Sequence, residues 1–62
     1  MLNKNNIYHM LEKCRECAKD KNKVVLPEYF ISYLNIVKEW AKLNNYQIRI
    51  TDTMFKFIVL TK

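Results

Sequence analysis

Residues 26–45 carry the longest regular pattern of apolar and polar positions in the chain. At about 100° per residue, their apolar side chains share one side of a helix and most of their polar side chains share the other. Pro27 suits a first helical turn, where no N–H is needed, and Asn44-Asn45 suits the left-handed conformation that ends a helix. The apolar arc covers roughly half of the circumference, more than the ~100° of a helix with one buried face. We therefore predict a helix that contacts two neighbouring elements.

A second amphipathic pattern runs from about residue 7 to residue 20. Asn5 or Asn6 is expected to cap its N-terminal end, because an Asn side chain accepts hydrogen bonds from the first turn. The pattern predicts a helix with a single buried face, packed against the longer helix. Its apolar positions fall within an arc of roughly 120°: Ile7, Met10, Leu11, Cys14, Cys17 and Ala18.

The period changes after Asn45, where two apolar and β-branched segments, 46–51 and 54–61, predict strands joined by a tight turn at 52–53. Residues 24–26 are compatible with a short edge strand or with a segment packed under the longer helix. The fold class is thus α+β: two helices packed on a C-terminal antiparallel β-hairpin, in the order α-α-β-β, as one small domain over 1–62. The expected inward-facing pairs are Tyr46 with Val59, Ile48 with Phe57, and Ile50 with Phe55.

The same pairing places Arg49 opposite Lys56 on the outer face of the hairpin, beside Met54, Ile58 and Leu60. Like charges directly across a strand pair are unfavourable, and no other segment is predicted to cover this face. We therefore expect an outer face that is partly basic and partly apolar. Its partner would be a protein with an acidic or partly apolar surface, or a second copy of the chain in a homodimer.

Composition points to an AT-rich genome, since the chain is rich in Lys, Asn and Ile and contains no glycine and one proline. Short chains of this composition are typical of phages and mobile elements. The net charge of +5 is compatible with an anionic partner. Basic residues near aromatic ones can bind nucleic acid, and Lys38, Lys42, Arg49 and Lys56 are the candidate phosphate contacts. Arginine, the usual reader of guanine, occurs at only two positions, Arg15 and Arg49.

Catalytic and metal-binding motifs are weak. Cys14 and Cys17 form a CxxC pair, but a closed zinc site needs four ligands, and the only histidine, His9, is predicted on the opposite side of the helix. Cysteines on an apolar stripe pack as small hydrophobic residues, so we predict core positions and no metal or cofactor. A zinc-bridged dimer through this pair is the alternative.

A chain without glycine cannot build a glycine-rich phosphate loop, and no nucleophile–base pair is apparent. No apolar run reaches the ~20 residues of a membrane span, so we expect a cytoplasmic protein with no membrane partner. The sequence favours a non-enzymatic interaction protein, of the phage inhibitor or regulator type, that binds a host protein through Arg49, Lys56, Met54 and Ile58. A small basic nucleic-acid-binding regulator is the alternative.

Overall fold

The computed structural model describes residues 3–51 and 53–62. Two helices, a 3₁₀ helix and three strands follow one another in these residues: α1 (Lys4–Cys17), β1 (Lys23–Leu26), η1 (Glu28–Tyr33), α2 (Leu34–Leu43), β2 (Gln47–Ile50) and β3 (Ile58–Thr61). The α+β class predicted from the sequence is confirmed.

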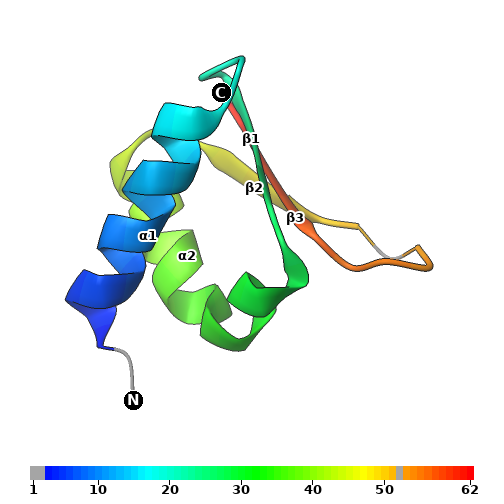
Figure 1. The fold of residues 1–62 in the computed structure, drawn as a ribbon, viewed down its shortest axis with the longest axis horizontal. Helices are drawn as coiled ribbons and strands as arrows, with labels where there is room; N and C mark the ends of the chain where they lie inside the picture. Colours follow the sequence, from blue (N-terminus) through cyan, green and yellow to red (C-terminus); the bar gives the residue numbers. More distant parts are fainter. Residues whose placement is uncertain (1–2, 52) are drawn as a thin grey trace.

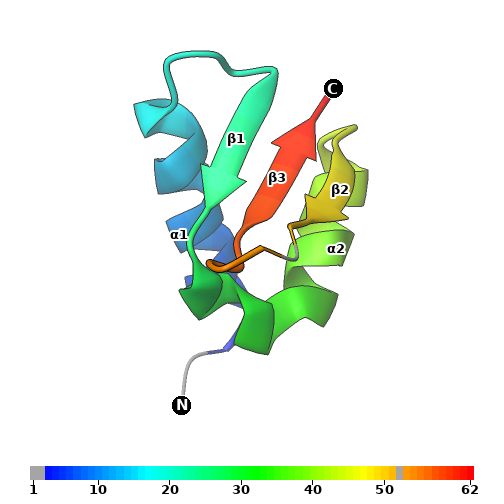
Figure 2. The same cartoon turned by 90° about the vertical axis from the view of Figure 1, so that its right-hand side faces the viewer.

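The strands form one antiparallel sheet in the order β1-β3-β2. The segment 24–26 is therefore a strand, and it pairs with β3 along one side while β2 pairs with the other. The β2–β3 hairpin is not the whole sheet, because β1 comes from the middle of the chain. Both helices lie on one face of the sheet, and the opposite face is bare in the described part of the chain (Figures 1 and 2).

Helix α1 begins earlier than predicted, at Lys4, because Asn3 is the cap: its side-chain oxygen accepts the N–H of Asn6 at 2.9 Å. The predicted caps Asn5 and Asn6 are wrong, since both lie inside the helix. At its other end Ala18 closes the helix, and the ammonium of Lys21 donates to the last carbonyls, including that of Glu16. A cation is favourable there because helix carbonyls carry partial negative charge.

The predicted continuous helix over 26–45 is interrupted. Pro27 precedes η1, which has three residues per turn, and Tyr33 leaves helical geometry (φ −118°, ψ 29°) before α2 starts at Leu34. A change of helical period explains the wide apolar arc, because side chains before and after the junction point in different directions. Helix α2 contacts both α1 and β2, as predicted for an element with two neighbours. It ends at Leu43, and Asn45 just beyond it takes the left-handed conformation (φ 62°) that the sequence predicts.

The core lies between the two helices and the inner face of the sheet. Trp40 of α2 is at its centre, 2% exposed, with its ring stacked 5.7 Å from that of Tyr46. The other buried side chains come from every element except β2: Ile7, Leu11, Val24, Leu26, Phe30, Val37, Ala41, Ile58 and Leu60.

The predicted pairing of β2 with β3 is wrong by three positions. Ile48 lies opposite Leu60 instead of Phe57, and Arg49 lies opposite Val59 instead of Lys56. An odd shift exchanges the two faces of a strand, so Ile58 and Leu60 point into the core whereas Phe55 is 71% exposed. Asp52, half of the predicted tight turn, lies outside the described residues.

None of the helices in residues 3–51 and 53–62 has the length and apolar character needed to cross a membrane.

Candidate interaction surface

The bare face of the sheet, here called the outer face, is built from alternate residues of all three strands. The strand registers align Val25, Val59 and Arg49 in one row across the sheet, and Lys23, Thr61 and Gln47 in the next. Side chains of successive residues point to opposite faces, and the inner-face neighbours Val24, Leu26, Ile58 and Leu60 are buried. The outer face therefore carries two adjacent valines, Val25 and Val59, and one cation on each edge strand, Lys23 and Arg49.

A shallow depression of about 330 Å³ lies on this face, between Lys23 of one edge strand and Arg49 of the other, and Val59, Thr61 and Thr51 complete its lining. Val25 is 52% exposed although it is the neighbour of buried Val24 and Leu26. A sheet with one solvated face usually carries polar side chains there. Valines and two cations in that position form a mixed basic and apolar surface.

The connection between β2 and β3, here called the hairpin loop (residues 53–56), extends away from the body of the protein (Figure 1). Thr51 fixes its base: the Thr51 N–H donates to the Phe57 carbonyl at 3.0 Å, and the Phe57 N–H donates to Thr51 Oγ1 at 3.1 Å. Met54 is 91% exposed at the tip. The loop thus presents two large apolar side chains, Met54 and Phe55, next to the cation Lys56.

The structure separates the residues that the sequence grouped as one binding surface. Arg49 lies on the outer face, and Met54 and Lys56 lie on the hairpin loop. Ile58 is fully buried, so its assignment to the binding surface is wrong. Its side chain fills the core because β3 is the central strand and both of its neighbours bring apolar residues to the same face.

Lys38 and Lys42 are exposed on α2. Helix α2 packs on the inner side of the sheet (Figure 1), so these two cations and Arg49 do not share one surface.

The residues of the candidate surface that were missed at the sequence level include Lys23, Val25, Phe55 and Val59, the last two of which were predicted to face inward. Lys23 and Val25 join it because β1 pairs with β3, and a four-residue strand carries too short a pattern to reveal this. One signal was present for β3. Its uninterrupted run Ile58-Val59-Leu60 places an apolar side chain on the outer face as well as on the inner face, because side chains alternate along a strand.

The cysteines differ from each other. Cys14 is half-buried beside the core and Cys17 is exposed, so the predicted core position is wrong for Cys17. Burial raises the pKa of the Cys14 thiol above its ordinary value, and the neighbouring Cys17 adds to this effect. A raised pKa keeps Cys14 protonated, the form that is a poor metal ligand and a poor nucleophile. In residues 3–51 and 53–62, His, Cys, Asp and Glu side chains form no group of three or more that could hold a metal ion.

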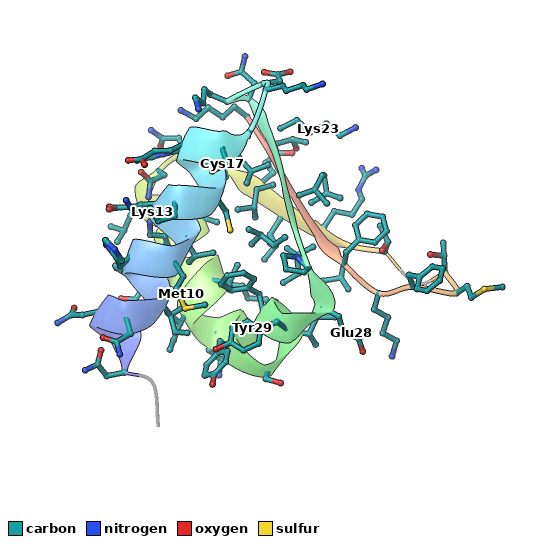
Figure 3. All side chains as sticks on the ribbon, in the orientation of Figure 1. Met10, Lys13, Cys17, Lys23, Glu28 and Tyr29 are labelled. Atoms are coloured by element: carbon teal, nitrogen blue, oxygen red, sulfur yellow. The ribbon has the colours of Figure 1, made fainter. Side chains whose placement is uncertain are left out.

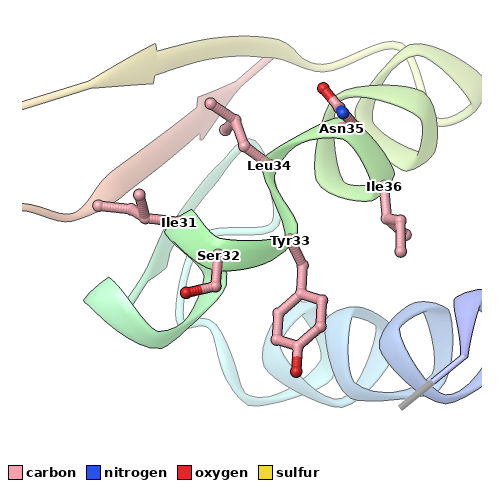
Figure 4. A pocket seen from close by; sticks show the side chains of 6 residues that line it. All are labelled: Ile31, Ser32, Tyr33, Leu34, Asn35 and Ile36. Carbon is pink, nitrogen blue, oxygen red and sulfur yellow. The ribbon is translucent and has the colours of Figure 1, made fainter. Parts of the chain in front are cut away.

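A cavity of about 320 Å³ at the η1–α2 junction is lined by six consecutive residues, 31–36. Figure 4 shows that these side chains diverge: Ile31 and Leu34 point toward the strands, whereas Tyr33 and Ile36 point toward α1. The segment thus packs between the strands on one side and α1 on the other. It brings no set of ionisable side chains together.

No protein-family model matches the sequence, and neither the curated proteins nor the solved structures include a significant match.

Proposed function

We propose that this chain is a non-enzymatic interaction protein that binds another protein through its outer face and hairpin loop. The single observation that carries the proposal is the exposure of two large apolar side chains on the hairpin loop, where Lys56 adds a cation and the adjoining strand β2 carries Arg49. Phe55 is 71% exposed and Met54 91%, while Arg49 lies two residues before Thr51, at the base of the same loop. The residue composition, rich in Lys, Asn and Ile and without glycine, indicates an AT-rich genome and supports an inhibitor or regulator of phage or mobile-element type, acting on a host protein.

The exposed apolar side chains favour association because burying them removes apolar surface from water. Full burial of a Phe or Met side chain contributes roughly 1.5–3 kcal/mol, and exposed apolar patches commonly mark interaction sites. The cations beside them favour a partner whose surface is acidic around an apolar centre. A net charge of +5 also speeds encounters with such a partner.

Nucleic-acid binding, the alternative from the sequence, has less support from the arrangement of the cations. Phosphate contacts follow one backbone and therefore need cations on one continuous surface. Lys38 and Lys42 lie on α2, Arg49 lies on the outer face, and Lys56 lies on the hairpin loop. Protein binding needs only the last two, together with Met54 and Phe55.

The test is capture of a partner from a lysate of a low-GC bacterial host by the immobilised protein. We expect the double variant M54S/F55S, and separately Arg49→Glu, to lose a protein that the parent chain retains. Leu43→Ser is the matched control, because Leu43 is 67% exposed on α2 and lies away from the proposed surface. A captured set that is the same for the parent, M54S/F55S and Arg49→Glu would refute the proposal. Loss of a nucleic acid with Lys42→Glu, in a salt-dependent manner, would favour the alternative.

A further inference from the structure

A groove of about 470 Å³ runs beside the outer edge of β1, where α1 ends and β1 begins. Figure 3 labels Cys17 and Lys23 on the two elements that meet there. One wall comes from the end of α1 and the other is the edge of β1. The lining residues are Cys14, Cys17, Ala18, Lys19, Asp20, Lys23 and Val25.

The edge of β1 offers backbone hydrogen-bonding groups to this groove. The Lys62 N–H donates to the Asn22 carbonyl at 3.0 Å. Hydrogen-bonded residues alternate along an antiparallel strand, so the backbone groups of Val24 and Leu26 also bond to β3. Those of Lys23 and Val25 point outward, away from β3. The Lys23 N–H is used, since it donates to the Asp20 carbonyl at 3.0 Å. The Lys23 carbonyl and both the N–H and the carbonyl of Val25 have no partner among the described residues.

The next outward position is Pro27, which has no N–H and whose carbonyl accepts the Phe30 N–H at 3.1 Å. Proline at an edge blocks further strand pairing. The open part of β1 therefore spans Lys23 to Val25, and only a short segment fits it.

We propose that this groove binds a short, extended, acidic and apolar peptide segment of a partner protein, which pairs with β1 as a fourth strand. Backbone pairing at a sheet edge is a common mode of peptide recognition, with alternate side chains giving specificity. The groove supplies an apolar helix wall and two cations, Lys19 and Lys23, against one carboxylate, Asp20. The inference rests on the proposed role as an interaction protein. The groove shares Lys23 and Val25 with the outer face and has no residue in common with the hairpin loop.

The alternation of side chains specifies the peptide. A residue opposite Lys23 lies beside a cation and is expected to be acidic, and a residue opposite Val25 is expected to be apolar. The residue between them points to the inner side, toward the α1 wall at Cys14 and Ala18, and is expected to be apolar as well. Because either strand direction satisfies the same three backbone groups, the probe is symmetric: acetyl-Glu-Val-Val-Val-Glu-amide.

The experiment measures amide hydrogen exchange by nuclear magnetic resonance with this peptide present and absent. At a peptide concentration ten times the dissociation constant, about one tenth of the protein remains free. We therefore expect exchange of the Val25 amide to slow about tenfold. Exchange at the exposed residue Lys56 of the hairpin loop, which lies outside the groove, should stay unchanged and serves as the internal control. Acetyl-Lys-Val-Val-Val-Lys-amide should leave Val25 unprotected.

Two variants separate backbone pairing from charge. Val25→Pro removes the outward donor without touching the β1–β3 ladder, so we expect a folded protein that no longer binds the peptide. Lys23→Glu keeps the outward backbone groups of β1 but reverses the charge beside them. This variant should therefore bind the lysine peptide more tightly than the glutamate peptide. M54S/F55S should bind the peptide like the parent chain, so failure of the hairpin-loop proposal and failure of this one are distinguishable.

The inference is overturned if the Val25 amide is not protected at millimolar peptide, or if the Lys56 amide of the hairpin loop is protected equally. It is also overturned if Lys23→Glu binds the two peptides as the parent chain does.

Discussion

At the scale of single residues, the packing around Trp40 carries much of the fold. The Arg15 guanidinium lies 5.3 Å from the Trp40 ring centre on one side, and the ring of Tyr46 stacks on Trp40. The Lys62 ammonium lies 5.0 Å from the Tyr46 ring. A cation, two rings and a second cation thereby join α1, α2, the start of β2 and the end of β3. Cation–π contacts of this kind contribute roughly 0.5–2 kcal/mol each, more when they are desolvated.

Two substitutions measure this cluster. Trp40→Ala should cost about 3–5 kcal/mol of unfolding free energy, because it removes a large side chain from a packed interior. That equals a large part of the roughly 3–9 kcal/mol available to a chain of this length. Tyr46→Phe removes only the hydroxyl that donates to the Lys21 carbonyl at 2.6 Å and should cost about 1 kcal/mol. Urea denaturation measures both, and equal losses would contradict the central position of Trp40.

The two cysteines should react at different rates for a physical reason. Cys17 is exposed, whereas Cys14 is half-buried and its pKa is raised by that burial. Since the thiolate is the reactive form, iodoacetamide at neutral pH should alkylate Cys17 first. Mass spectrometry after proteolysis measures the order. Equal rates, or faster reaction of Cys14, would show that α1 does not present these residues as described.

At the scale of elements, the sequence predicts the two helices and the hairpin better than the partners of the strands. The helices and the hairpin follow from hydrophobic periodicity, whereas this periodicity does not predict the 3₁₀ geometry of η1 and leaves residues 24–26 open between a strand and a packed segment. The pairing of β2 with β3 does not follow from it either, because residues 54–60 place apolar side chains on both faces: Met54, Ile58 and Leu60 on one, Phe55, Phe57 and Val59 on the other. The pairing of β3 with β1 decides between them, because it places Ile58 and Leu60 beside the buried side chains of Leu26 and Val24 on the inner face.

The residues of the candidate surface were also predicted correctly only where their position does not depend on strand pairing. Arg49 keeps its outward position in either register, since its parity is set within β2, and a partly basic, partly apolar outer face is present. Lys56 and Ile58 do not keep theirs, because their positions depend on the pairing. The facing of a side chain that is predicted within one strand is therefore retained, whereas a facing that depends on the pairing of two strands is wrong when their register is wrong.

The register itself has a direct test. Ile58→Ser places a hydroxyl in the core and should cost about 3 kcal/mol or more, whereas Phe55→Ser changes a 71% exposed side chain and should stay within about 0.5 kcal/mol. The pairing predicted from the sequence requires the reverse order. Thermal denaturation of the two variants followed by circular dichroism decides between the two registers.

At the scale of the whole molecule, the question is what opposes self-association of a three-stranded sheet that is covered on only one face. Bare sheet faces and free edges favour self-association. Stacking two outer faces would bring Lys23 and Arg49 of one copy near the same cations of the other, and the repulsion acts within the screening length of about 10 Å at 0.1 M salt. The arrangement therefore predicts a monomer at low ionic strength.

The double variant K23S/R49S removes these two cations and leaves Val25 and Val59 side by side on the outer face. We expect it to self-associate at concentrations where the parent chain is a monomer, and sedimentation equilibrium measures the difference. K38S/K42S is the matched control: it lowers the net charge by the same amount on α2, on the other side of the sheet, and should remain monomeric. If both variants associate equally, overall charge and not the outer face keeps the copies apart. If neither associates, the outer face is not apolar enough to bind itself, and its exposed valines would contribute correspondingly little to any partner docked there.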